Sequence, residues 1–108
     1  MHTGVGNGVA VPHARLPALI TPLVCLGLSR EGIDFDAPDG EPAQIILLIL
    51  TPIHDDCAQL EILADSARIF SKKEIRNRAM KVTSYSDFLN LVEEARKESR
   101  KPEKSRQG

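Results

Sequence analysis

The sequence contains no tryptophan, one tyrosine, three phenylalanines and only two cysteines among its 108 residues. Cys25 and Cys57 are too few for a disulfide framework and do not form a C-x-x-C pair, so we expect buried free thiols in a reducing compartment. No apolar run approaches the roughly 18–20 residues that cross a membrane. The N-terminus also lacks the basic and then apolar segments of a secretory signal. These absences predict a cytoplasmic protein.

The chain also lacks an excess of charge of one sign, because 14 Lys and Arg balance 15 Asp and Glu to a net charge of −1. A charge so close to zero gives no reason to expect nucleic acid as a partner. The balance hides a split, since residues 96–108 carry six basic and two acidic residues, against eight and thirteen in residues 1–95. Residues 96–108 have nothing to bury, which predicts a charged, disordered tail.

Three segments have the pattern of β-strands. Residues 23–28 form a short apolar run, and residues 33–36 alternate apolar with acidic side chains, as a half-exposed strand does. Residues 43–50 end in six consecutive Ile and Leu residues. Such a continuous run predicts a central strand that is covered on both faces, as in an α/β sheet.

Three amphipathic helices are expected after the last strand. Asp55 or Asp56 can cap the first helix, while Ser71 and Ser84, each followed three residues later by an acidic residue, can begin the other two. The apolar stripes are Leu60, Leu63, Ala64, Ala67 and Phe70 in the first helix and Phe88, Leu91, Val92 and Ala95 in the third. The predicted fold is therefore α/β, a mixed sheet flanked by helices in a layered sandwich, with one domain over residues 1–95.

The most informative stretch is residues 3–16, which read Thr-Gly-Val-Gly-Asn-Gly-Val-Ala-Val-Pro-His-Ala-Arg-Leu. Glycines at every second position allow positive φ angles and let backbone amides converge into an anion nest. The small apolar residues that follow are expected to enter the interior and deliver Pro12 and His13 at an edge. With Arg15 within reach of an anion, this stretch is suited to hold a phosphoryl group on an imidazole nitrogen.

Other kinds of site fit the sequence less well. The glycines do not satisfy G-x-G-x-x-G, and no strand precedes them, which argues against a dinucleotide site. The three histidines are scattered without carboxylates or cysteines at ligand spacing, so no metal site is expected. The sequence contains no G-x-S-x-G motif, so it does not indicate a serine hydrolase. The structural interpretation of a lone histidine, a packed or solvent-facing loop residue, stays open beside the phosphohistidine.

Residues 3–16 closely resemble the active-site signature of the fructose/mannitol-type enzyme IIA domains of the bacterial phosphotransferase system, which include the nitrogen-regulatory IIA proteins. The resemblance continues through residues 30–40 and on to about Leu91. It implies that His13 is phosphorylated by HPr or a paralogue and passes the phosphoryl group to a IIB domain, or acts as a regulatory signal. It implies no metal or cofactor. The residues expected around the phosphoryl group are Gly6, Asn7, Gly8, Pro12, Arg15 and Gln59.

The chain departs from that family in two ways. Family domains carry a strand, helices and a phosphate-neutralising arginine ahead of the signature, and the loss of such elements would leave apolar surface that a homo-oligomer could bury. Gln59, before Leu60, stands where the family usually has a second histidine, and glutamine donates hydrogen bonds without bringing charge. His54 lies five residues earlier, and the sequence leaves open whether it belongs to the phosphoryl site. The alternative function is a regulatory module, without phosphotransfer, that binds a transporter, a kinase or another protein.

Overall fold

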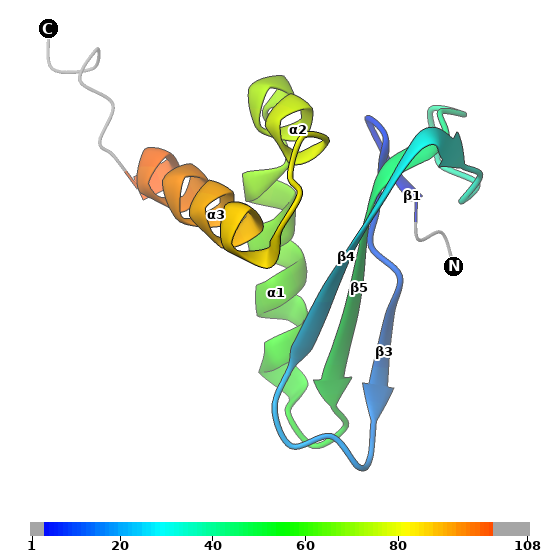
Figure 1. The fold of residues 1–108 in the computed structure, drawn as a ribbon. Coiled ribbons are helices and arrows are strands. Elements are labelled where there is room, and N and C mark those ends of the chain that lie inside the picture. Colours follow the sequence, from blue (N-terminus) through cyan, green and yellow to red (C-terminus); the bar gives the residue numbers. More distant parts are fainter. Residues whose placement is uncertain (1–3, 101–108) are drawn as a thin grey trace, which may run out of the picture. The chain divides into compact units, whose positions relative to one another are not determined.

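The computed structural model describes residues 4–100. The chain divides into two compact units, residues 1–67 and residues 68–108. One domain over residues 1–95 stays a prediction. The strands and most of helix α1 (Asp56–Ile69) belong to the first unit. The end of α1, helix α2 (Lys73–Ala79) and helix α3 (Tyr85–Arg100) belong to the second (Figure 1).

Strand β5 (Ala43–Pro52) is the centre of the sheet. On one side it pairs in parallel with β2 (Val9–Ala10) and then with β3 (His13–Leu16). On its other side it pairs antiparallel with β4 (Leu23–Ile33), and the short β1 (Gly4–Gly6) pairs with β2. This arrangement confirms the mixed sheet of the α/β class that the sequence predicted (Figure 1).

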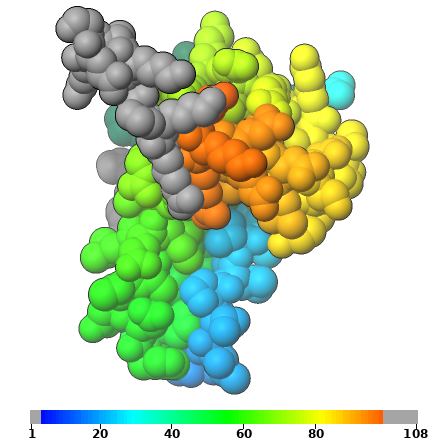
Figure 2. Space-filling model, turned by 90° about the vertical axis from the view of Figure 1, so that its left-hand side faces the viewer, coloured from blue at the N-terminus to red at the C-terminus, as the bar shows by residue number. Residues whose placement is uncertain are grey.

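The two faces of β5 differ in burial. Side chains alternate between the faces of a strand, and the buried set is Ala43, Ile45, Leu47, Ile49 and Thr51. On the opposite face Leu48 is 38% exposed, and Leu23 and Cys25, which lie on the same face of β4, are exposed as well. The prediction that both faces are covered was therefore wrong. Within the first unit α1 lies beside β4, as Figures 1 and 2 both show.

Two further expectations were also wrong. Cys25 and Cys57 are both exposed, not buried. Residues 34–36 form no strand, because the Asp34 side chain accepts a hydrogen bond from the Asp36 amide at 2.8 Å and Asp36 has a φ of 56°. A short acidic side chain that bonds its own backbone competes with a strand ladder in this way. The segment instead leads from β4 into the turn before β5.

The helix starts follow the predicted caps in two cases out of three. Asp55 accepts from the Ala58 amide at 3.1 Å, and Ser84 accepts from the Asp87 amide at 3.1 Å. Ser71 does not cap α2, because its hydroxyl donates to the Arg68 carbonyl at 2.8 Å at the end of the preceding helix. The predicted stripe of α1 also fails at Leu60, which is 70% exposed, and at Ala64 and Ala67, which are exposed as well.

Helices α2 and α3 form the core of the second unit. The apolar residues buried in these two helices are Ile75, Ala79, Leu91 and Ala95. Ion pairs join Lys72 to Glu98 and Arg78 to Glu94, so α3 continues to Arg100 although the sequence predicted its end near residue 95. Residues 101–108 of the expected tail lie outside the described residues. Basic residues outnumber acidic ones twelve to six in the whole of this unit, and not in the tail alone.

Candidate functional site

His13 begins β3 directly after a break in the strand pair. Pro12 lies between β2 and β3 and has no amide hydrogen to donate, yet its carbonyl accepts from the Ile49 amide at 2.9 Å. The pairing with β5 therefore continues through the break, and His13 stands opposite Ile49. The sequence predicted that Pro12 would deliver His13 at an edge, and β3 has no partner other than β5 among the described residues.

The His13 ring is oriented by the backbone just before it. Its Nδ1 lies 2.7 Å from the carbonyl oxygen of Val11, and the side chain is half-buried. A carbonyl oxygen only accepts hydrogen bonds, so Nδ1 carries the proton and donates. The other nitrogen, Nε2, is left with its lone pair. A histidine held in this tautomer can act as a nucleophile through Nε2.

Arg15 lies two residues further along β3 and therefore on the same face as His13. Its Nη2 donates two hydrogen bonds, one to the Ile53 carbonyl and one to Asp56 Oδ1, both at 2.6 Å. The Arg15 and Asp56 side chains are 37% and 88% exposed. This ion pair joins the end of β3 to the first residue of α1.

Gln59 lies one turn into α1 and is half-buried. Residues three apart share a side of a helix, so Gln59 is on the side of Asp56 that faces the ion pair with Arg15. The ion pair between Arg15 and Asp56 thus links β3, which also carries His13, to the start of α1, which carries Gln59. His54 is exposed in the loop between β5 and α1.

The glycine stretch has a different place from the one expected. Asn7 and Gly8 have φ angles of 59° and 78° and form the tight turn of the hairpin between β1 and β2, as an Asn-Gly pair commonly does. Gly8 accepts from Ile45, whereas His13 stands opposite Ile49. Four residues of strand separate the two places by about 13 Å. The amides of Gly6, Asn7 and Gly8 therefore do not lie beside the His13 ring.

The Asp39 carboxylate accepts a hydrogen bond from the Asn7 backbone amide in this turn. The Asn7 amide donates to Asp39 Oδ2 at 2.8 Å, and the Glu41 amide donates to Asp39 Oδ1 at 3.0 Å. The bond from the Asn7 amide has the larger effect on Asp39 and the bond from the Glu41 amide the smaller one. Together they hold the pKa of Asp39 below its usual value. The predicted anion nest is thus filled by a residue of the chain itself.

Comparisons with known proteins show which family the chain resembles in sequence and fold. A family model described as the phosphoenolpyruvate-dependent sugar phosphotransferase system, EIIA 2, matches residues 1–95. The chain belongs to this EIIA family. It is 35% identical over 92 residues to a fructose-specific EIIA component of Haloferax volcanii, and 34% identical over 90 residues to a nitrogen regulatory protein of Pseudomonas aeruginosa. These matches cover 85% and 83% of the EIIA chain, respectively.

Solved structures show the same relationship. The nitrogen regulatory protein IIA-Ntr of Neisseria meningitidis superposes with a TM-score of 0.77 at 36% identity, covering 84% of the EIIA chain and 62% of that protein. The EIIA chain covers 60% of the Haloferax protein and 58% of the Pseudomonas protein. It thus spans about three fifths of the length of these relatives.

Neither a metal-ligand cluster nor a membrane-spanning helix accompanies the His13 site in the described part of the EIIA chain. No group of three or more His, Cys, Asp or Glu side chains suited to a metal ion occurs within residues 4–100. In the same part of the chain, no helix has the length and apolar character to cross a membrane.

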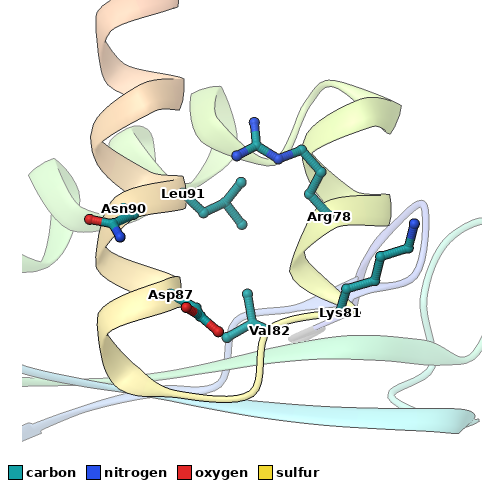
Figure 3. A pocket seen from close by; sticks show the side chains of 6 residues that line it. All are labelled: Arg78, Lys81, Val82, Asp87, Asn90 and Leu91. Carbon is teal, nitrogen blue, oxygen red and sulfur yellow. The ribbon is translucent and has the colours of Figure 1, made fainter.

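A hollow of about 250 Å³ lies within residues 68–108, between α2 and α3 (Figure 3). Its lining residues are Arg78, Lys81, Val82, Asp87, Asn90 and Leu91. In Figure 3 the polar ends of Lys81 and Asn90 point away from the hollow on opposite sides, while Arg78 is paired with Glu94. The polar groups do not converge on one point, and none of the residues of the His13 site contributes to the lining.

Two functional contacts of the EIIA chain were not found from the sequence. Asp56 was interpreted as the start of a helix, although Asp55 makes the cap and Asp56 pairs with Arg15. Asp39, in the turn before β5, holds the hairpin turn 32 residues away. Both contacts join segments that are distant in the chain, and a sequence pattern has no signal for such pairs.

Neutralising Asp39 should loosen the hairpin of β1 and β2. Its folded pKa is lowered, so its contribution to stability is present above about pH 4, the unfolded value, and is lost as pH falls through the folded pKa. We expect Asp39→Asn to lower the urea midpoint at about pH 7, and the difference from the wild type to shrink as the pH falls below about 4. Glu41→Gln is the matched control, because the Glu41 backbone and not its side chain makes the bond.

Proposed function

We propose that the chain is a phosphocarrier domain in which His13 accepts a phosphoryl group from HPr or a similar donor protein. His13 then passes the group to a IIB domain, or the modified domain regulates a transporter or a kinase. The observation that carries the proposal is the hydrogen bond from Nδ1 to the Val11 carbonyl, because in the neutral form of this half-buried ring it places the lone pair on Nε2. A cytoplasmic location belongs to the same proposal.

The transfer follows from this tautomer. The Nε2 lone pair forms a bond to phosphorus, and the bond from phosphorus to the donor breaks with its electron pair retained by the donor. No proton has to leave the His13 ring, because the proton is on Nδ1 and stays in its bond to Val11. That carbonyl also faces the positive charge that develops on the ring as Nε2 bonds to phosphorus. The main contribution of the protein is position and charge.

Two other side chains have roles in the proposal. Arg15 supplies the positive charge that a phosphoryl group requires, through the guanidinium nitrogens that Ile53 and Asp56 do not use. Gln59 supplies a neutral amide donor. The proposal does not assign phosphate binding to Gly6, Asn7 and Gly8, since the hairpin holds them at the other end of the strand pair.

The direct test is incubation with phosphoenolpyruvate, enzyme I and HPr, followed by intact-mass measurement. The expected result is the gain of one acid-labile phosphate, with the phosphorus bonded to Nε2 in ¹⁵N NMR spectra. A chain of unchanged mass, when a known EIIA protein in the same mixture becomes phosphorylated, would overturn the proposal.

A regulatory module without phosphotransfer is the second candidate. Two observations favour it. Gln59 stands in place of a second histidine, and residues 1–67 carry nine acidic but only two basic residues, a charge balance that opposes a dianion. In the same assay this candidate predicts unchanged mass.

We also propose that a second copy covers the open face of the sheet. The apolar residues on that face include Leu23 and Leu48, which are 50% and 38% exposed, beside Leu16 at the end of β3. Contiguous exposed apolar surface of this kind favours association. Light scattering at micromolar concentration should give a mass above that of one chain, and Leu48→Glu should lower it, whereas Leu60→Glu on α1 should not. A monomer in the wild type would contradict this proposal.

A further inference from the structure

Within the unit that contains His13, few residues carry positive charge. Residues 1–67 contain two basic residues, Arg15 and Arg30. Arg30 lies on β4, on the far side of β5 from the strand that carries His13. Arg15 is therefore the guanidinium on the strand of His13, and its state of pairing determines how much of the positive charge of this unit an anion at His13 meets.

The two partners of Arg15 are not equivalent. Both hydrogens of Nη2 are used, one by the Ile53 carbonyl and one by Asp56, at equal distances of 2.6 Å. The neutral carbonyl of Ile53 holds the guanidinium in place without cancelling its charge. The carboxylate of Asp56 does cancel it. The hydrogens on Nη1 and Nε remain for another acceptor, since a guanidinium has five in all.

Asp56 does not make the cap of the helix that it begins. The first amides of α1 are capped by Asp55, whose Oδ1 accepts from Cys57 and Ala58. The Asp56 side chain is 88% exposed and its partner is Arg15. A neutral residue at position 56 would therefore leave the cap intact and change the charge beside Arg15.

We propose that Asp56 competes with an oxyanion at His13 for the Arg15 guanidinium. In the unmodified protein Arg15 is paired with Asp56, and when a phosphate or phosphoryl group lies at the His13 ring, Arg15 turns its charge to that group. Asp56 is a positioning residue that acts through Arg15, and it sets how tightly the site holds the anion. For its biological meaning this inference rests on the proposed function.

The test uses inorganic phosphate, which needs no transfer reaction. Phosphate is titrated into the full chain while the NMR signals of the His13 ring and of Arg15 Nε are followed. Asp56→Asn should bind phosphate about two- to five-fold more tightly than the wild type, the size expected of one exposed ion pair. Asp56→Glu, which keeps the carboxylate, should bind like the wild type.

Two controls separate this mechanism from a general charge effect. Glu61→Gln removes one negative charge elsewhere on the exposed surface of α1 and should leave the affinity unchanged. In an Arg15→Gln background, Asp56→Asn should lose most of its effect. Equal gains in Asp56→Asn and Glu61→Gln, a gain that persists without Arg15, no gain, or weaker binding in Asp56→Asn would each overturn the inference.

The outcome is also distinct from that of the proposed function. A chain whose phosphate affinity responds to Asp56 as described, but which the donor protein does not phosphorylate, contradicts the proposed function and not this inference. A chain that becomes phosphorylated while its phosphate affinity ignores Asp56 contradicts this inference alone.

Discussion

Replacing His13 with glutamine should reduce phosphorylation by HPr by more than about a thousand-fold, to below detection. Glutamine is similar to histidine in length and is also polar and neutral. Its amide nitrogen has no available lone pair, because that pair is delocalised into the carbonyl. The variant therefore removes the nucleophile with little change in shape. Intact mass after incubation with the donor system measures the loss.

His54→Gln is the matched control for this prediction. His54 is an exposed histidine in the loop before α1, so its replacement tests whether any accessible imidazole can accept the group. We expect His54→Gln to gain one phosphate as the wild type does. A His13→Gln chain that still gained an acid-labile phosphate, with the gain lost in His54→Gln, would assign the acceptor to the wrong residue.

Ile49→Ala should lower the free energy of unfolding of the first unit by about 2–5 kcal/mol, the usual cost of truncating a large apolar side chain in a core. Ile49 is 0% exposed on the buried face of β5 and stands opposite His13. The change leaves a cavity under the strand pair that positions the ring. Urea denaturation at fixed protein concentration measures the loss.

Leu60→Ala is the control for the effect of burial. Leu60 is also a large apolar residue of the first unit, but it is 70% exposed, and a surface substitution of this kind is expected to stay within about 0.5 kcal/mol. Equal losses in the two variants would mean that the buried face of β5 is not the core of this unit.

The local features of the fold were predictable because they depend on residues close together in the chain. The continuous Ile and Leu run gave the central strand β5, and the caps at Asp55 and Ser84 depend on bonds that span three residues. The mixed sheet followed from the order of strands and helices. The cap expected at Ser71 failed because the serine hydroxyl had a competing acceptor at the end of α1, and a motif does not rank such competitors.

Burial was predicted less well because it depends on what covers a surface. Residues 45–50 are uniformly apolar, but only alternate side chains of β5 are buried. Leu60 fits an apolar stripe by its spacing and is nevertheless exposed. The period of a pattern shows which residues share a face, whereas the presence of a covering element is a property of the folded chain.

By itself, the sequence determined the family, the class of fold and the candidate nucleophile, because the order Pro-His-x-Arg and its surroundings are local properties of residues 3–16. Only the tertiary structure decided what surrounds each candidate. It placed the glycines in a hairpin about 13 Å from His13. It also paired the Asn7 amide with Asp39 in a hydrogen bond and the Arg15 guanidinium with Asp56 in an ion pair. These pairs join residues 32 and 41 positions apart, and their formation depends on strand register and helix placement, which no short segment encodes.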